Sequence, residues 1–123
     1  MKVKFYGTRG SVPTPDPDYF QFGGNTSCIQ VTFSTGRLAI LDAGTGIRNL
    51  GNDLIRNSHE QYDNINIILS HTHWDHIQGF PFFITTRNIT IPFYQIWEMD
   101  AGSFFQTLFL PEKTTKSSYK RPL

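Results

Sequence analysis

The chain has 123 residues, enough for one ordinary domain, and a formal net charge of +1. So small a charge disfavours a protein that coats nucleic acid or an anionic membrane surface. Hydrophobic residues make up 38% and aromatic residues 15%, so the composition predicts a packed core and excludes a largely disordered chain.

Cysteine usage and hydropathy bear on the compartment. The one cysteine, Cys28, cannot form an internal disulfide, which favours a reducing environment. No apolar run is long enough to span a membrane, and the residues after Met1 do not form the apolar segment of a signal peptide. We therefore expect a soluble, cytoplasmic protein with no membrane partner, in which Cys28 is a buried small hydrophobe.

The first third of the chain predicts three strands and a long loop. Residues 2–6 alternate polar and apolar side chains before Gly7, which is typical of a strand that ends in a turn. Residues 8–26 contain three prolines and three glycines and predict an irregular loop, of a length that is usually functional. Residues 28–33 and 38–42 are rich in β-forming residues and flank a turn-like STGR segment, so they predict an antiparallel hairpin.

The remaining elements alternate between helix and strand. Apolar residues recur at helical spacing from Ile47 to about Asn57, and residues 65–69 form the apolar run of a buried strand. Residues 89–97 predict a further strand at a sheet edge, because Pro92 interrupts them. A short helix is expected over 103–110, and residues 111–123 are expected to form a polar, basic tail.

Three of the four histidines lie directly after the predicted strand 65–69. His71 and His73 are one residue apart, so in extended backbone both imidazoles lie on the same side. Asp75 and His76 add a carboxylate and a third imidazole, a ligand mixture that suits Zn²⁺. One short loop cannot easily aim all four groups at one ion, so the spacing predicts two adjacent metals, which suit hydrolysis.

The segment from His71 to His76, HTHWDH, resembles the signature of the metallo-β-lactamase superfamily. The segments GTRGS (7–11), GGNTSC (23–28) and LDAGTG (41–46) are similar to the branch that includes ribonuclease Z and certain cyclic-nucleotide phosphodiesterases. This resemblance extends to about Leu110. It implies an α/β fold, the αββα sandwich of that superfamily, with a mixed or antiparallel sheet and flanking helices.

The resemblance also implies a role for each motif residue. His71 and His73 would bind one metal, and Asp75 and His76 the second. Asp75 would be catalytic because its metal stabilises charge on the phosphoryl oxygens. Asp42 would hold the ligand loop through hydrogen bonds. The expected cofactor is Zn²⁺, two ions in a complete family member, with Mn²⁺ or Fe²⁺ as alternatives, and the expected substrate is a small-molecule or nucleotide phosphodiester.

Several neighbouring side chains have a structural alternative. The less favoured alternative for Asp42 is a turn or helix-cap carboxylate, and Asn25, Thr26 and Ser27 either line the site or satisfy their own turns. The aromatic residues Trp74, Phe80, Phe82 and Phe83 offer an apolar wall for a base, but for the phenylalanines packing in the core is the favoured interpretation.

The sequence departs from the superfamily pattern in its second half. Members supply further histidine and aspartate ligands there, whereas this chain has no histidine after His76 and one aspartate, Asp100. Residues 1–110 therefore match the N-terminal part of such a domain. Each metal would have two protein ligands, so we expect an incomplete metallohydrolase that is inactive alone. The alternative is a non-catalytic remnant or interaction module.

A half-sandwich would leave one sheet face without its partner layer. The residues expected to lie exposed, or to be covered by another chain, include Val31, Phe33 and Ile40. The sequence therefore predicts self-association through an apolar sheet face.

Overall fold

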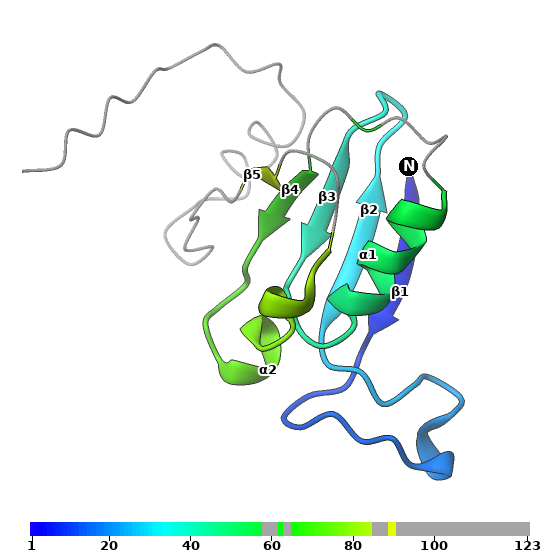
Figure 1. The fold of residues 1–123 in the computed structure, drawn as a ribbon, viewed down its shortest axis with the longest axis vertical. Coiled ribbons are helices and arrows are strands. Elements are labelled where there is room, and N and C mark those ends of the chain that lie inside the picture. The colour runs from blue at the N-terminus through cyan, green and yellow to red at the C-terminus, as the bar shows by residue number, and fades with distance from the viewer. Residues whose placement is uncertain (58–61, 63–64, 85–88, 91–123) are drawn as a thin grey trace, which may run out of the picture.

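The computed structural model describes residues 1–57, 62, 65–84 and 89–90, which form a mixed five-stranded sheet with strand order β1-β2-β3-β4-β5 (Figure 1). The predicted α/β class is confirmed, and of the two expected sheet types, mixed or antiparallel, the structure has the mixed one. The remainder of the predicted strand 89–97, the predicted helix 103–110 and the tail 111–123 lie outside the described residues.

The first three strands form an antiparallel meander. β1 (Lys2–Gly7) pairs with β2 (Cys28–Thr32), which pairs with β3 (Leu38–Leu41). The β2–β3 turn is closed by the Phe33 N–H, which donates to the Arg37 carbonyl, and Gly36 there adopts a positive φ of 80° that favours glycine. The predicted hairpin is confirmed.

The chain then changes from antiparallel to parallel pairing. α1 (Ile47–Arg56) connects β3 to β4 (Ile65–Ile68), and β4 lies parallel to β3. β5 (Ile89–Thr90) adds a second parallel pair. The helix predicted from apolar residues at helical spacing and the buried strand predicted from an apolar run are both confirmed.

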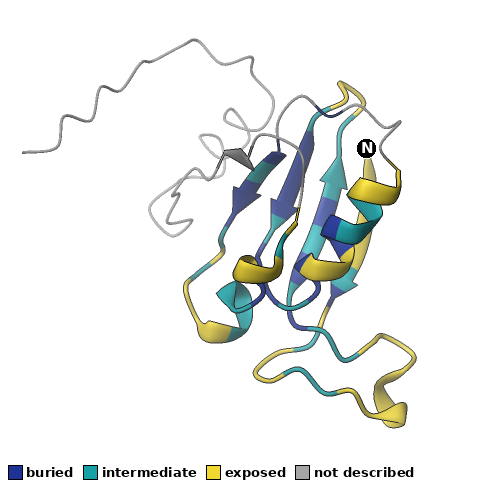
Figure 2. Cartoon of the chain, in the orientation of Figure 1, coloured by how far each residue is buried: buried dark blue, intermediate teal, exposed yellow. Residues whose placement is uncertain are grey.

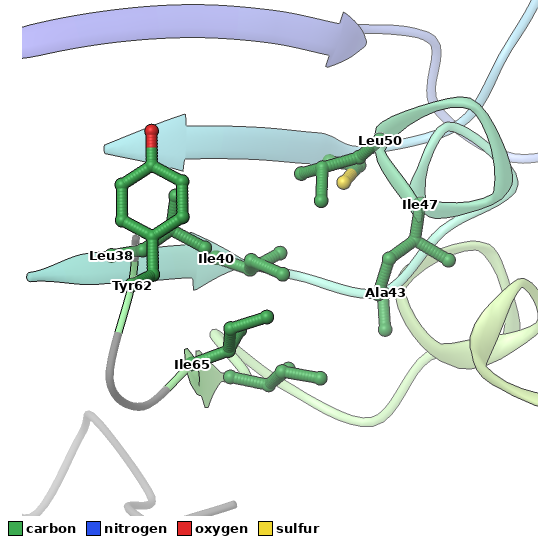
Figure 3. Close-up of a cluster of buried hydrophobic side chains, with 9 residues drawn as sticks. Leu38, Ile40, Ala43, Ile47, Leu50, Tyr62 and Ile65 are labelled. Atoms are coloured by element: carbon green, nitrogen blue, oxygen red, sulfur yellow. The ribbon is translucent and has the colours of Figure 1, made fainter. Parts of the chain in front are cut away.

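The core lies between α1 and the sheet face that α1 covers (Figure 3). Ile47 and Leu50 from α1 meet Leu38 and Ile40 from β3, and all four side chains are fully buried. Ile65, Ile67, Ala43, Cys28 and Tyr62 complete the cluster. Burial of each aliphatic side chain contributes about 1.5–3 kcal/mol, so this layer stabilises both α1 and the central strands.

Apolar side chains are exposed on the opposite face of the sheet. Lys4 and Tyr6 reach Asp53 of α1, so the alternating residues Val3 and Phe5 point away from the helix, and they are 46% and 62% exposed. Figure 2 shows β1 largely exposed and β3 and β4 largely buried.

The prediction that Ile40 lies exposed is wrong. Ile40 pairs with Gln30 across the hairpin, on the face that α1 covers, and is fully buried. Val31 and Phe33 are half-buried. The hairpin register, which sets this assignment, cannot be read from composition alone.

Three connections meet at the carboxyl ends of β1, β3 and β4 (Figure 1). The first, residues 8–27, contains the short 3-10 helix η1 (Pro17–Tyr19). The last contains α2 (Trp74–Ile77), which the sequence did not predict, and η2 (Phe80–Phe82). Among the described residues, no helix is long and apolar enough to cross a membrane.

Candidate metal centre

Asp42 is the centre of a hydrogen-bond network below the histidine motif. It follows β3, is 6% exposed, and adopts a left-handed φ of 62°, which is uncommon for a residue with a side chain. Its carboxylate accepts the Ser70 N–H at 2.7 Å, the Ser70 hydroxyl at 2.8 Å and the Ser27 hydroxyl at 3.2 Å. The end of β3 is thereby tied to the residue that opens the motif loop.

His76 is oriented by the same carboxylate. Its Nδ1 lies 2.8 Å from Asp42 Oδ2. Because an ionised carboxylate only accepts hydrogen bonds, Nδ1 carries the proton in this contact. In the neutral imidazole Nε2 then holds the lone pair, and Nε2 lies 3.4 Å from Asp75 Oδ2. A carboxylate behind one ring nitrogen, with the other nitrogen facing a ligand position, is the arrangement typical of metal-binding histidines.

The other two histidines of the motif lie against this pair. The His71 ring centroid is 4.0 Å from that of His76 and 4.5 Å from that of His73. His71 Nδ1 also lies 3.0 Å from the Ser70 hydroxyl, which in turn donates to Asp42. The three imidazoles that the sequence singled out are therefore brought together at the end of β4.

Asp75 is held from a different direction. Its Oδ2 accepts the backbone N–H of Ser11 at 2.9 Å, across 64 residues of sequence. This hydrogen bond is the main reason why the pKa of the Asp75 carboxyl lies below its ordinary value, so the group is ionised at neutral pH.

The donor types fit a divalent metal of the zinc class, namely imidazole nitrogens and one ionised carboxylate. The four donors lie next to one another, with the His71 ring between those of His73 and His76 and with His76 Nε2 beside Asp75. Within residues 1–57, 62, 65–84 and 89–90, no group of three or more His, Cys, Asp or Glu side chains is arranged so that it could hold one ion. Metal binding by all four residues stays a prediction.

The GGNTSC segment supports the site from below. Buried Thr26 and half-buried Thr45 bond reciprocally, since the Thr26 N–H donates to Thr45 Oγ1 and the Thr45 N–H donates to Thr26 Oγ1. Asn25 Oδ1 accepts the Thr45 hydroxyl. Of the three polar residues considered at this position, Ser27 alone contacts Asp42, while Asn25 and Thr26 join the two loops.

Two glycines bring the site backbones into direct contact. A Cβ added at Gly44 would lie 2.5 Å from the Asp75 carbonyl oxygen, and one at Gly79 would overlap the Gly44 carbonyl. The Gly79 N–H donates to the Ala43 carbonyl, and the Ala43 N–H donates to the His76 carbonyl. The turn after β3 and the backbone around α2 therefore pack without intervening side chains.

Two of the three phenylalanines around the motif are more exposed than expected, and Trp74 is exposed as well. Trp74 is 71% and Phe82 61% exposed, and Phe80 is 39% exposed. The interpretation that the phenylalanines fill the core is therefore wrong for Phe80 and Phe82, whereas Phe83 packs against the core. Phe80 and Phe82 lie on η2, which directs them toward solvent. An element of three residues is too short to produce a recognisable apolar pattern in the sequence.

Cys28 takes no part in this site. It is fully buried, and burial, with a contribution from the Asp42 charge, raises the pKa of its thiol to about 12. The thiol is therefore protonated and inert at neutral pH, as expected of a small core hydrophobe.

Sequence reasoning missed the serines that organise the site. Ser70 directly precedes the motif, and a hydroxyl next to His71 was a signal that could have been used. Ser11 lies in the GTRGS segment, but its contact with Asp75 was not predicted, because its contribution is a backbone N–H and not its side chain.

Comparison with known proteins adds no assignment to this geometry. No protein-family model matches the chain, and no curated protein matches it either.

Proposed function

We propose that this chain carries the metal-binding part of a metal-dependent phosphodiester hydrolase of the metallo-β-lactamase type. The observation that carries the proposal is the contact between His76 Nδ1 and Asp42 Oδ2 at 2.8 Å, which turns Nε2 toward Asp75. A merely structural histidine would not need its second nitrogen beside an ionised carboxylate. The likeness of the HTHWDH segment to the superfamily signature supports the same conclusion.

The described residues prepare a site for a cation. Hydrogen bonds with Asp42 and Ser70 hold the rings of His71 and His76 in place. Asp75 supplies a carboxylate that is ionised at neutral pH. A bound divalent metal supplies Lewis acidity toward a phosphoryl oxygen. The chain's own contribution is to orient the nitrogen and carboxylate donors before the ligand arrives, so that less reorganisation is needed.

Metal binding is the first test. Titration calorimetry with Zn²⁺ should show weak binding that is abolished when His71 and His73 are both changed to alanine. His59→Ala is the matched control, because it removes an imidazole outside the motif. Binding by the double variant as strong as that of the parent would contradict the assignment.

Hydrolysis is the second test. With two ligands per metal, we expect little or no turnover of bis(p-nitrophenyl) phosphate by the 123 residues, even with added Zn²⁺ or Mn²⁺. A chimera that appends the second half of a metallo-β-lactamase-type phosphodiesterase should turn the substrate over, and His73→Ala or Asp75→Ala should abolish this activity.

The same chimera separates the proposal from its alternative. A folded, zinc-loaded chimera without turnover would favour a non-catalytic interaction module. Robust turnover by the isolated chain, lost in Asp75→Ala, would instead show that the remaining ligands come from another source, for which a second copy of the chain is the favoured candidate.

A further inference from the structure

A tight turn in the first connection faces the candidate metal centre. Arg9 donates from Nε to the Val12 carbonyl at 2.8 Å and so closes a loop around Gly10 and Ser11. Within this loop Ser11 adopts a φ of 72°, and its N–H points at Asp75 Oδ2, 2.9 Å away. A residue with a Cβ held in the left-handed region costs free energy, and such residues cluster at functional sites.

The turn is anchored on both sides. The backbone N–H of Arg9 donates to the Asn25 carbonyl at 3.0 Å, and the Arg9 guanidinium lies 4.2 Å from the centre of the Tyr19 ring. Asn25 in turn accepts the Thr45 hydroxyl, which belongs to the loop after β3. The direction of the Ser11 N–H is therefore set by the framework of the site and not by a freely moving loop.

We propose that the turn 9–12 is a positioning element that clamps the Asp75 carboxylate through the Ser11 N–H. This inference rests on the proposed function, in which Asp75 is a metal ligand. One oxygen of the carboxylate is held by the backbone, so the carboxylate cannot rotate away from His76 without losing a hydrogen bond. The affinity of the site for a metal then depends on Arg9 and Ser11, although neither offers a ligand atom to it.

The clamp itself is tested without metal, by amide hydrogen exchange measured with NMR. In Asp75→Ala the Ser11 amide should exchange about ten-fold faster than in the parent, because a charge-assisted hydrogen bond is lost. Asp53→Ala is the matched control: it removes a carboxylate from α1 and should leave Ser11 unchanged. Equal Ser11 exchange in the parent and Asp75→Ala would overturn the inference.

Zinc affinity, measured by competition with a chromophoric chelator, tests the consequence. Ser11→Pro removes the N–H and cannot adopt a positive φ, whereas Ser11→Gly keeps the N–H and accepts that φ. We expect about a ten-fold loss of affinity in Ser11→Pro and Arg9→Ala, and a change within about two-fold in Ser11→Gly. Arg48→Ala, which removes an exposed cation from α1, should behave like the parent.

The exchange and affinity experiments together distinguish failure of the positioning role from failure of the proposed function. If the parent binds Zn²⁺ but Ser11→Pro and Arg9→Ala bind it as tightly, the positioning role is wrong and the proposed function stands. If the parent binds no Zn²⁺, the proposed function fails, and the exchange of the Ser11 amide still decides whether the clamp exists. Should Ser11→Pro fail to fold by circular dichroism, Arg9→Ala decides the affinity arm.

Discussion

Replacing Asp42 should lower the free energy of unfolding, and variants can separate the contribution of its hydrogen bonds from that of its left-handed backbone. Its carboxylate is 6% exposed and accepts hydrogen bonds from Ser27 and Ser70 and from His76. Asp42→Gly removes these contacts while accepting the left-handed φ of 62°. Hydrogen bonds to a charged group contribute about 1.5–3 kcal/mol each, but water can reach Ser70, so we expect a total loss of about 2–4 kcal/mol.

Two further variants isolate the backbone contribution. Asp42→Ala removes the same contacts and adds the left-handed penalty, which should lower stability by about 1 kcal/mol more than Asp42→Gly. Asp42→Asn tolerates the left-handed φ and keeps one acceptor oxygen, so it should cost only about 1–2 kcal/mol.

Urea unfolding followed by circular dichroism measures these losses. A loss of about 2–4 kcal/mol is a large part of the stability of an ordinary domain and should shift the midpoint by roughly 1–2 M. Asp18→Gly, which removes an exposed carboxylate from η1, is the control and should change stability by less than about 0.5 kcal/mol. If Asp42→Gly unfolds at the same urea concentration as this control, the hydrogen-bond network does not stabilise the fold as argued.

Three other predictions concern parts of the chain outside the metal centre. Cys28 should resist iodoacetamide at about pH 8 in the folded protein and react after unfolding, because burial keeps its thiol protonated; rapid reaction of the folded protein would contradict this. Hydrogen bonds from Lys4 and Tyr6 lower the pKa of Asp53 below its ordinary 3.8. Stability from Asp53 is therefore present above that value and lost as the pH falls through the lower folded-state pKa. Asp53→Asn should flatten the acid side of the stability profile, and an unchanged profile would refute the assignment. Phe5→Ser should reduce self-association in sedimentation experiments at micromolar concentration, and a parent chain that is already monomeric would count against the exposed sheet face as the cause.

The elements that the sequence predicted are those with a local pattern. The hairpin, α1 and β4 follow from β-branched runs, a turn composition and helical spacing, each confined to a few consecutive residues. The short helix α2 has four residues and no apolar periodicity of its own, so nothing in the sequence distinguished it from a loop. The face on which Ile40 lies depended on pairing register, which is a property of two strands together.

The same distinction applies to the candidate site. The motif residues were recognisable because histidine and aspartate at that spacing are chemically unusual. The groups that position them were not: Ser27 lies 15 residues and Ser70 28 residues from Asp42 in the sequence. The left-handed backbone of Asp42, like that of Ser11 beside Asp75, is a second feature that the sequence does not show, because residues with a Cβ adopt this conformation only occasionally.

The contact between Gly44 and Gly79 limits how this site can diversify. Any side chain at either position must push one backbone away from the other, which moves Asp75 and His76 together and not one at a time. Substitutions at these two glycines therefore cannot change the geometry of the site in small steps. Thr72 and Trp74 are exposed and alternate with the histidines in the sequence. Substitutions at these two positions can therefore change which molecules contact the site without moving its backbone. Under the proposed function, a library aimed at new substrates should hold the two glycines constant and randomise Thr72 and Trp74.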